Sequence, residues 1–547
     1  MKSVFVQWIF LLICAVAISC KNDEPAPDSG AKNISLTDLK LDGRAFSYTY
    51  SGTSINPEMV FTFSEPIDHT SAQSAFVLVD AVGNAALNVT FSHGDSTLTV
   101  RAVAPLKYLT SYSFQVSSSL ASTTGKKLDS DVLVKIVTTY NPADKFPRIS
   151  DNELLDLVQK QTLKYFYDFA HPVSGMARER NTAGNTVTSG GSGFGIMALI
   201  VGMERNFISR SDGINQANKM VTFLEKADRF HGVWSHWIDG NTGKVIPFST
   251  KDNGGDLVET SFLIQGLITF RQYLQPTDTV GNNLINRINK LWNEVEWDWY
   301  RKNNENVLYW HWSPNYNWEM NFPMYGYFEE QITYFLAASS PTHSIPKMVY
   351  SNGYGKNGSI VKNATYYGIR LPLESPSPLF WVHYSYLGLN PHFSDEYANY
   401  WEQNVNATLI NRAYCIANPK KYVGYGESCW GLTSSDNQSG YNAHSPSNDL
   451  GVITPTAALS SFPYTPNESM QALKFFYYTL GDKLWGQYGF YDSFNLTTAW
   501  TASSTLAIDQ GPIIVMIENH RSKLLWNLFM SAPEVQQGMT KLNFTSN

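Results

Sequence analysis

The sequence is poor in cysteine and in charged residues, and both shortages restrict what the protein can be. Four of its 547 residues are cysteines, 16% are charged, and the formal net charge is −7. The acidic balance argues against nucleic acid as a partner. Two cysteines lie within the first twenty residues, which leaves Cys415 and Cys429. Because a chain of this length can bury a large core without crosslinks, we expect free thiols, with a disulfide as the alternative.

The motifs of several common chemistries are also absent. There is no H-E-x-x-H and no other spacing of a zinc site, and the glycine-rich stretch at 190–195 is not followed by the lysine of a P-loop. No G-x-S-x-G elbow occurs. Beyond the N-terminal stretch, no run of eighteen apolar residues could form a membrane-spanning helix. We therefore expect neither a metal nor a cofactor.

The N-terminus has the pattern of a bacterial lipoprotein signal. Residues 1–20 combine an early lysine, an apolar stretch and a serine before Cys20. We expect cleavage before Cys20 and lipidation of this residue, which would anchor the protein to the outer membrane of a Gram-negative bacterium. The acidic segment 21–24 resembles a cell-surface tag, and a periplasm-facing position is the alternative. Residues 21–32 would form a polar tether.

The next part of the chain alternates with the period of β-strands. Between residues 33 and 140, short apolar runs are separated by turn residues, at 59–63, 75–79, 98–102, 112–116 and 132–136. This pattern predicts a small β-sandwich, ended by a linker at 141–149. It contains no cluster of catalytic residue types. We expect a spacer, and a sugar-binding module is the alternative.

From residue 150 to 547 the apolar spacing becomes helical. Beyond a first helix after Ser150, we expect helices at 193–205, 211–227, 256–273, 280–296, 327–339, 376–388, 394–415, 466–480 and 509–530. With a few shorter pieces the number approaches about twelve, which is typical of an (α/α)6 toroid. The protein would then be mainly α, with one concave face built by the loops before the inner helices.

Three carboxylates precede one of these helices at helical spacing. Asp252, Asp256 and Glu259 are separated by four and three residues, ahead of an apolar run. Like charges at this distance raise one another's pKa, so one group can stay a proton donor while another is ionised. Asp256 and Glu259 also fit a structural capping box, whereas Asp252 does not. Together with abundant Trp and Tyr, the trio favours glycoside hydrolysis.

A second carboxylate would complete an acid–base pair. Glu329 begins another expected helix, and its neighbour Glu330 should point elsewhere. A helix dipole alone would favour either glutamate there. Asp509 and Glu518 are further candidates, although Asp509 is more simply explained as a helix cap and Glu518 as a buried partner of Arg521 or of a backbone group.

Aromatic and histidine side chains gather in the loops between the helices. Core packing is the default interpretation of a tryptophan, and we expect about half of them to be core. The others would stack on sugar rings, with histidines bonding to hydroxyl groups. The candidate substrate-binding residues are His236, Trp237, Trp310, Trp312, Phe380, His383 and Trp430.

Two resemblances add to these predictions. Residues 63–68 and 106–114 resemble bacterial immunoglobulin-like domains. From about residue 150 onward, the chain resembles glycoside hydrolase family 144, the bacterial β-1,2-glucanases also labelled glucoamylase-like. The stretches that carry this likeness are 193–195, 236–247, 251–259, 310–323, 326–329 and 509–512.

The second resemblance implies a fold and an activity. It implies an (α/α)6 toroid that attacks β-1,2-glucan with inversion of the anomeric centre and without a metal. The important acidic residues look like Asp252, Asp256 and Glu259, with Glu329 on the second helix. The chain departs from the family at Phe328, where an asparagine is usual. This departure affects the shape of the subsites, and therefore whether the enzyme cleaves the glucan at a chain end or internally.

We predict a monomeric glycoside hydrolase that cleaves β-1,2-glucan to sophoro-oligosaccharides. Glu329 would donate the proton, and Asp256, with Asp252 and Glu259, would position and activate water; the two roles could be exchanged. The alternatives are an exo-acting, sophorose-releasing or β-glucosidase-like enzyme, a lyase, and a non-catalytic glycan-binding lipoprotein. A lyase would need basic side chains to neutralise a uronate, and the cleft segments contain few.

Overall fold

The computed structural model describes residues 33–274 and 279–546. The predicted signal peptide, tether and lipidated Cys20 therefore lie outside the described residues. Within the described ranges, no helix is long and apolar enough to cross a membrane. Cys415 and Cys429 are both buried and free, as expected from the sequence.

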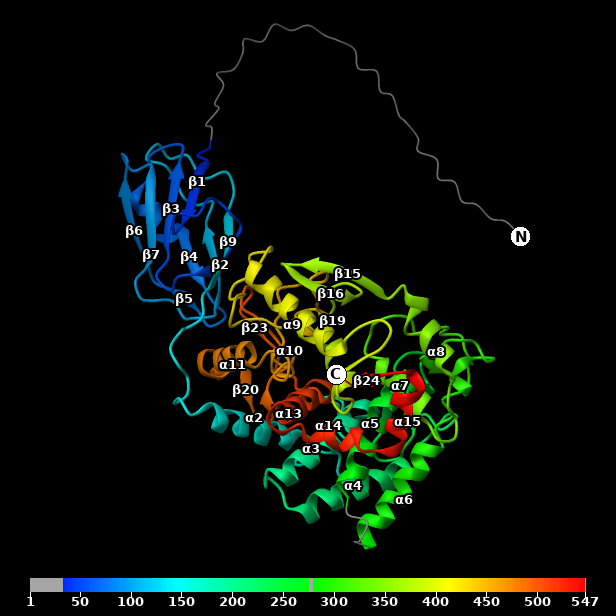
Figure 1. Ribbon diagram of the computed structural model, residues 1–547. Coiled ribbons are helices and arrows are strands. Elements are labelled where there is room, and N and C mark those ends of the chain that lie inside the picture. Colours follow the sequence, from blue (N-terminus) through cyan, green and yellow to red (C-terminus); the bar gives the residue numbers. More distant parts are fainter. Residues whose placement is uncertain (1–32, 275–278, 547) are drawn as a thin grey trace, which may run out of the picture.

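The N-terminal domain is the expected β-sandwich, drawn in blue in Figure 1. Its apolar side chains alternate along the strands, so each sheet buries one face against the other. Phe61, Phe76 and Phe114 pack together in this core. One sheet contains β1 (Leu36–Leu41), β3 (Glu58–Phe63), β7 (Thr97–Ala102) and β6 (Leu87–Ser92). The other contains β2 (Thr49–Thr53), β9 (Val132–Thr138), β8 (Ser111–Val116), β4 (Phe76–Val79) and β5 (Asn84–Ala85), and α1 (His69–Ala75) precedes β4.

The larger domain is the expected (α/α)6 toroid, in which outer and inner helical segments alternate along the described chain (Figure 1). The outer helices are α2 (Asp151–Phe166), α4 (Arg210–Leu224), α6 (Thr279–Asn293), α8 (Lys347–Asn352), α9 (Tyr400–Ala417) and α11 (Pro466–Lys474). The inner segments are α3 (Ser189–Glu204), α5 (Leu257–Tyr273), α7 (Gln331–Ser339), the 3-10 pair η3 (Leu379–Val382) and η4 (Tyr384–Tyr386), α10 (Pro455–Leu459) and α13 (Ala507–Ser522).

The two layers differ in composition for a physical reason. Inner helices are surrounded by other helices, so α5 and α7 are buried almost all round, whereas α4 and α6 bury one face only. The inner ring closes because α3 packs between α5 and α13, α7 packs between α5 and η4, and α10 packs against α13. A hydrogen bond from His383, after η3, to Ser461, after α10, links the remaining pair.

Several predicted helix boundaries were wrong. The helix expected at 376–388 is the 3-10 pair, and α7 begins at Gln331 rather than at 327. The helix expected at 509–530 is divided between α13 and α14 (Leu524–Met530), because Lys523 adopts the left-handed conformation that ends a helix. The segment 466–480 continues from α11 into a π-turn at Phe475–Thr479.

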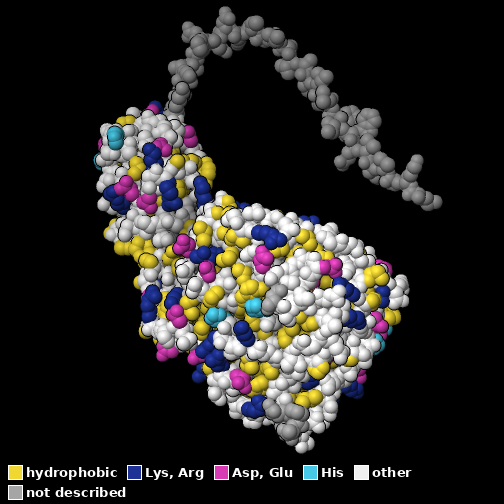
Figure 2. Space-filling model, in the orientation of Figure 1, with side chains coloured by type: hydrophobic (Ala, Val, Ile, Leu, Met, Phe, Trp, Pro, Cys, Tyr) yellow, Lys and Arg dark blue, Asp and Glu magenta, His cyan; other side chains and the backbone are white. Residues whose placement is uncertain are grey.

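The remaining elements are short and lie mainly in loops. Two are the C-terminal helix α15 (Pro533–Leu542), which packs on α7, and α12 (Gly481–Leu484). Short strands stand before the inner helices, including β10 (Thr186–Thr188), β11 (Trp237–Asp239), β12 (Val245–Ile246), β13 (Gly255–Asp256) and β14 (His311–Trp312). Figure 2 shows acidic and basic side chains interspersed on one face of the molecule.

Glycine lets two inner helices, α3 and α5, touch through their backbones. A Cβ atom on Gly193 of α3 would lie 2.2 Å from the carbonyl oxygen of Phe262 in α5. The reverse contact is as close, because a Cβ on Gly266 would lie 2.1 Å from the carbonyl oxygen of Gly193. Glycine costs about 1 kcal/mol relative to alanine inside a helix, so its presence here is explained by close packing.

We expect Gly193→Ala to destabilise the toroid by about 1–3 kcal/mol, because the added methyl group must push α3 and α5 apart. Thermal or urea unfolding of the purified protein measures this change. Gly426→Ala is the matched control, since its Cβ would meet nothing closer than 3.8 Å. Equal stability of the two variants would contradict the close-packing interpretation.

Candidate active site

The loops before the inner helices surround a cavity of about 370 Å³. Pockets of this size hold small ligands or part of a polymer. Carboxylates and aromatic rings both contribute to its wall. The lining residues are Glu179, Arg180, Thr188, His236, Trp237, Phe248, Val258, Glu259, Phe262, Trp310, Glu329, Phe380, Tyr384, Ser434, Tyr441, Leu506 and Ile508.

Asp256 is the N-cap of α5 and is completely buried. Its Oδ1 accepts the backbone N–H of Glu259 at 3.0 Å, and its Oδ2 lies 3.2 Å from Nδ1 of His236. Burial opposes ionisation, but the hydrogen bond from His236 and the charge of nearby His311 outweigh it and hold the pKa of Asp256 below its ordinary value. Asp256 is therefore an ionised anchor for His236 and does not itself line the cavity.

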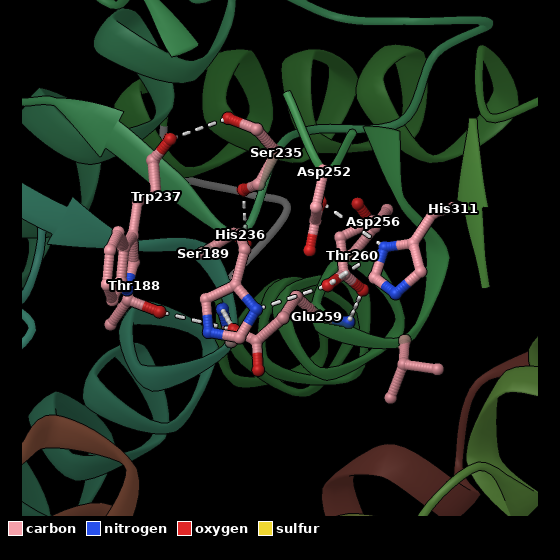
Figure 3. A network of polar contacts seen from close by, with 12 residues as sticks. Thr188, Ser189, Ser235, His236, Trp237, Asp252, Asp256, Glu259, Thr260 and His311 are labelled. Carbon is pink, nitrogen blue, oxygen red and sulfur yellow. Dashed lines mark hydrogen bonds and ion pairs between the residues drawn. The ribbon is translucent and has the colours of Figure 1, made fainter. Parts of the chain in front are cut away.

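Glu259 is the member of the predicted trio that lines the cavity. Its Oε2 accepts the backbone N–H of Gly190 at 2.8 Å and the hydroxyl of Thr188 at 3.2 Å, so it lies at the positive end of α3 (Figure 3). A Cβ on Gly190 would lie 2.5 Å from Oε2, which makes glycine necessary for this contact. Burial raises the pKa of Glu259, although His236 opposes the change.

Asp252 approaches the same group from the loop before α5. Its Oδ1 lies 3.3 Å from Nδ1 of His311, which β14 places opposite Asp256 on β13. Asp252, Asp256 and His311 bring three possible metal-ligand atoms within 4.8 Å of one another. Both Asp256 oxygens already have hydrogen-bonding partners, so we interpret the cluster as a network of polar contacts (Figure 3).

Glu329 contributes the carboxylate from the second helix, as the sequence predicts. It lies in the turn before α7, whose N-cap is Glu330, and its backbone carbonyl accepts the hydroxyl of Ser385. Its Oε2 is buried without a hydrogen-bond partner among the described residues. Burial, with added repulsion from Glu259 and Asp256, raises the pKa of Glu329 to about 8. Glu329 therefore holds a proton at neutral pH while Asp256 is ionised.

Glu330 is buried outside this cavity, which agrees with the expectation that it points elsewhere. Neither of its carboxyl oxygens has a hydrogen-bond partner among the described residues. Burial is the main cause that raises its pKa well above the ordinary range. Two adjacent glutamates are thus both protonated, but one of them lines the cavity.

A second carboxyl pair lies at the start of α13. Asp509 is in the first turn of α13 rather than at its cap, and it faces Asp492. No nitrogen or hydroxyl donor of the described residues reaches its two carboxyl oxygens. Burial and the charge of Asp436 raise the pKa of Asp492 to about 7, and burial with the charge of Asp492 raises the pKa of Asp509 well above its ordinary value, so the pair retains a proton at neutral pH. No motif in the sequence marks Asp492, so it was not among the predicted site residues.

Arg180 and Tyr384 are cavity residues that the sequence analysis also missed. Arg180 is held by Glu179 and Asp436. Tyr384 follows η3 and packs its ring on Phe262 of α5. Glu518, by contrast, forms an ion pair with Arg205 rather than the expected Arg521, and it lies outside the cavity.

Four of the seven predicted substrate-binding side chains line the cavity: His236, Trp237, Trp310 and Phe380. Burial disfavours the positive charge on His236, but the carboxylates of Glu259 and Asp256 outweigh it and raise its pKa to about 9. About a quarter of its side chain (27%) remains exposed. A cationic imidazole thus stands among the carboxylates.

The other three residues do not line the cavity. Trp430 is completely buried in the core. His383 is buried against Ser461, and burial lowers its pKa to about 3. Trp312 packs against His231 and Trp299 in a separate aromatic cluster, although its neighbour Trp310 reaches the cavity. Aromatic residue type alone does not distinguish cavity wall from core.

Two family matches fall on the two domains, one on the β-sandwich and one on the C-terminal part of the toroid. Residues 26–138 match the family described as "Bacterial Ig-like domain", and residues 321–533 match the one described as "Putative glucoamylase". Over 419 residues the chain is 47% identical to an exo β-1,2-glucooligosaccharide sophorohydrolase (non-reducing end) of Parabacteroides distasonis. This alignment covers 72% of the chain but 58% of that relative, so the chain spans less than two thirds of its length.

Solved structures extend the likeness. An endo-β-1,2-glucanase of Chitinophaga pinensis, in complex with sophorotriose and glucose, is 56% identical, with a TM-score of 0.72 over 73% of this chain and 99% of that one. A β-1,2-glucanase of Parabacteroides distasonis is 37% identical, with a TM-score of 0.71 over 93% of this chain and 73% of that one.

The charge network makes a prediction about His236 that does not depend on function. Its imidazole should titrate near pH 9, and Asp256→Asn should lower this pKa because a charged hydrogen-bond acceptor is lost. Ring-carbon NMR signals followed over a pH series measure it. His383 is the internal control, since its ring stays neutral down to about pH 3. A His236 pKa at or below the ordinary 6.5 would show that the carboxylates do not act on it.

Proposed function

Because this chain belongs to glycoside hydrolase family 144 and carries a bacterial Ig-like domain before the toroid, we propose that it hydrolyses β-1,2-glucan to short sophoro-oligosaccharides. The observation that carries this proposal is the pairing of a protonated Glu329 with a negatively charged group around Glu259 in one aromatic-lined cavity. Glycoside hydrolysis requires both a proton donor and a base.

We assign the donor role to Glu329. Its proton would pass to the glycosidic oxygen as the bond between that oxygen and the anomeric carbon breaks. A pKa of about 8 favours this role, because the group is protonated at neutral pH and gives up its proton when negative charge develops beside it. Water would attack the anomeric carbon from the opposite face, which inverts its configuration.

The base role falls to Glu259 rather than to Asp256. Asp256 uses both oxygens to hold Glu259 and His236, and it does not line the cavity. Glu259 lines it, and the positive charge of His236 keeps the carboxylate group able to accept a proton from water. Asp252 and Asp256 would then act by positioning, which differs from the leading role in activating water that the sequence analysis assigned to Asp256. The exchange of donor and base remains the alternative.

The choice between internal and chain-end cleavage depends on the cavity rim. One relative is named as an exo-acting enzyme and another as an endo-acting one. Phe328, the position that departs from the family, is 37% exposed and packs on Trp381 at a ring distance of 4.3 Å. This bulky pair is adjacent to Glu329 in the sequence but does not line the cavity, so the exo-acting alternative stays open. The lengths of the products distinguish the two modes.

We expect Glu329→Gln to reduce the release of reducing sugar from β-1,2-glucan by about 10²–10⁴-fold, because the amide cannot donate the required proton. The wild-type rate should also fall as pH rises through about 8, where Glu329 loses its proton. Initial rates with β-1,2-glucan measure both effects.

Glu330→Gln is the matched control for this variant. Glu330 is protonated and outside the cavity, so the nearly isosteric amide should retain most of the activity. Equal activity of wild type and Glu329→Gln would exclude Glu329 as donor. Absence of activity in both, on a panel of glucans of different linkage, would overturn the proposed hydrolysis.

We also propose that Cys20 is lipidated and anchors the protein to the outer membrane. The sequence before Cys20 supports this, and the Ig-like domain would act as a spacer between anchor and toroid. Expression of the full chain in a Gram-negative host should place it in the membrane fraction, and Cys20→Ala should release it. Identical fractionation of the two proteins would contradict lipidation at this residue.

A further inference from the structure

A second cavity of about 470 Å³ adjoins the first. The two share Arg180 and Tyr441 in their walls, so these residues stand at the junction between them. The new part is formed by the hairpin of β18 (Ser434–Asn437) and β19 (Gly440–Ala443), by β23 (Trp500–Thr501) and by the chain that leads to Ser504. It is more open than the first and lies on the side of Asp436 rather than Glu259.

Two carboxylates hold Arg180 at the junction, and some of its N–H groups have no acceptor among the described residues. Its Nε donates to Glu179 at 2.9 Å, and its Nη1 donates to Asp436 at 3.1 Å. Its Nη2 donates to no described residue. Because two carboxylates already hold the guanidinium in place and balance its charge, the remaining N–H groups can donate to a neutral ligand at little entropic cost.

Trp500 provides an apolar face in the same cavity. It lies on β23, which pairs with β22 (Phe494–Asn495), and its indole is partly exposed. Among the described residues, no aromatic ring packs against it, unlike Trp310, which packs on Phe322. The hydroxyls of Thr501 and Ser503 line the cavity too, and neither bonds to a described residue. A free indole face beside unused donors matches the apolar face and hydroxyl edge of a pyranose ring.

We propose that this second cavity is a distal subsite, which binds a glucose residue of the glucan chain beyond the units held between Glu259 and Glu329. Trp500 would stack on the sugar ring, and Arg180 would bond to a hydroxyl group at the junction. The inference rests on the proposed function, since it names a further part of the same substrate. It explains why polar groups continue along the wall away from Glu259 and Glu329.

The test compares long and short substrates. We expect Trp500→Ala to lower the ratio of kcat/KM for long β-1,2-glucan to that for the shortest oligosaccharide cleaved by about five- to tenfold, because only the long chain reaches the subsite. Trp500→Tyr should recover part of the ratio, since a ring remains. Tyr367→Ala is the control, because Tyr367 is 51% exposed and lines neither cavity.

A binding measurement separates this inference from the hydrolysis itself. In the Glu329→Gln background, isothermal titration with long β-1,2-glucan should give weaker binding when Trp500→Ala is added, by a similar factor. An unchanged ratio and unchanged binding would overturn the distal subsite while leaving the hydrolysis intact. Loss of glucan hydrolysis in the wild type, with the binding difference preserved, would instead overturn the proposed reaction and retain the subsite.

Discussion

The site depends on burying the carboxylates of Asp256 and Glu259 close together while each keeps hydrogen-bonding partners. An ionised group moved out of water is destabilised by several kcal/mol unless hydrogen bonds and opposite charges replace its hydration. Here the backbone supplies the hydrogen bonds, since Asp256 accepts an N–H from its own helix and Glu259 accepts one from α3. His236 supplies the opposite charge. Removing any one of these partners would leave a buried charge uncompensated. The positions of the remaining groups therefore depend on every partner.

Helix α3 joins this electrostatic arrangement to the packing of the toroid. Gly190 leaves room for the Glu259 carboxylate, and Gly193, one turn later, leaves room for the backbone of α5. Both contacts hold α3 against α5. The contact at Gly190 is a hydrogen bond to the Glu259 carboxylate, and the contact at Gly193 is van der Waals packing. The glycine-rich stretch at 190–195, which could be mistaken for a phosphate-binding loop, therefore serves to bring two inner helices close at the base of the cavity.

Patterns in the local sequence correctly predicted the features that neighbouring residues determine, such as strands and the start of a helix. Strand alternation located the β-sandwich, and the spacing of Asp252, Asp256 and Glu259 placed them together at the start of a helix. Whether a side chain faces the cavity depends on segments far away in the chain. Trp430 and Trp310 have the same chemistry, yet one is core and the other wall. Arg180 and Asp436 meet across 256 positions, and no local signal marks either.

The pKa of each carboxyl group also depends on its surroundings in the fold rather than on the local sequence. Glu329 and Glu330 are neighbours of one residue type, and burial raises the pKa of both. Only the first lines the cavity, because the turn before α7 directs successive side chains to different sides. Asp256 is buried even more completely than Glu329, but its hydrogen bonds and the neighbouring histidines keep it ionised. Burial alone thus produces a proton donor, and burial with partners produces an anion. A catalytic pair needs both environments within one cavity, which two inner helices of the toroid provide by entering it from different directions.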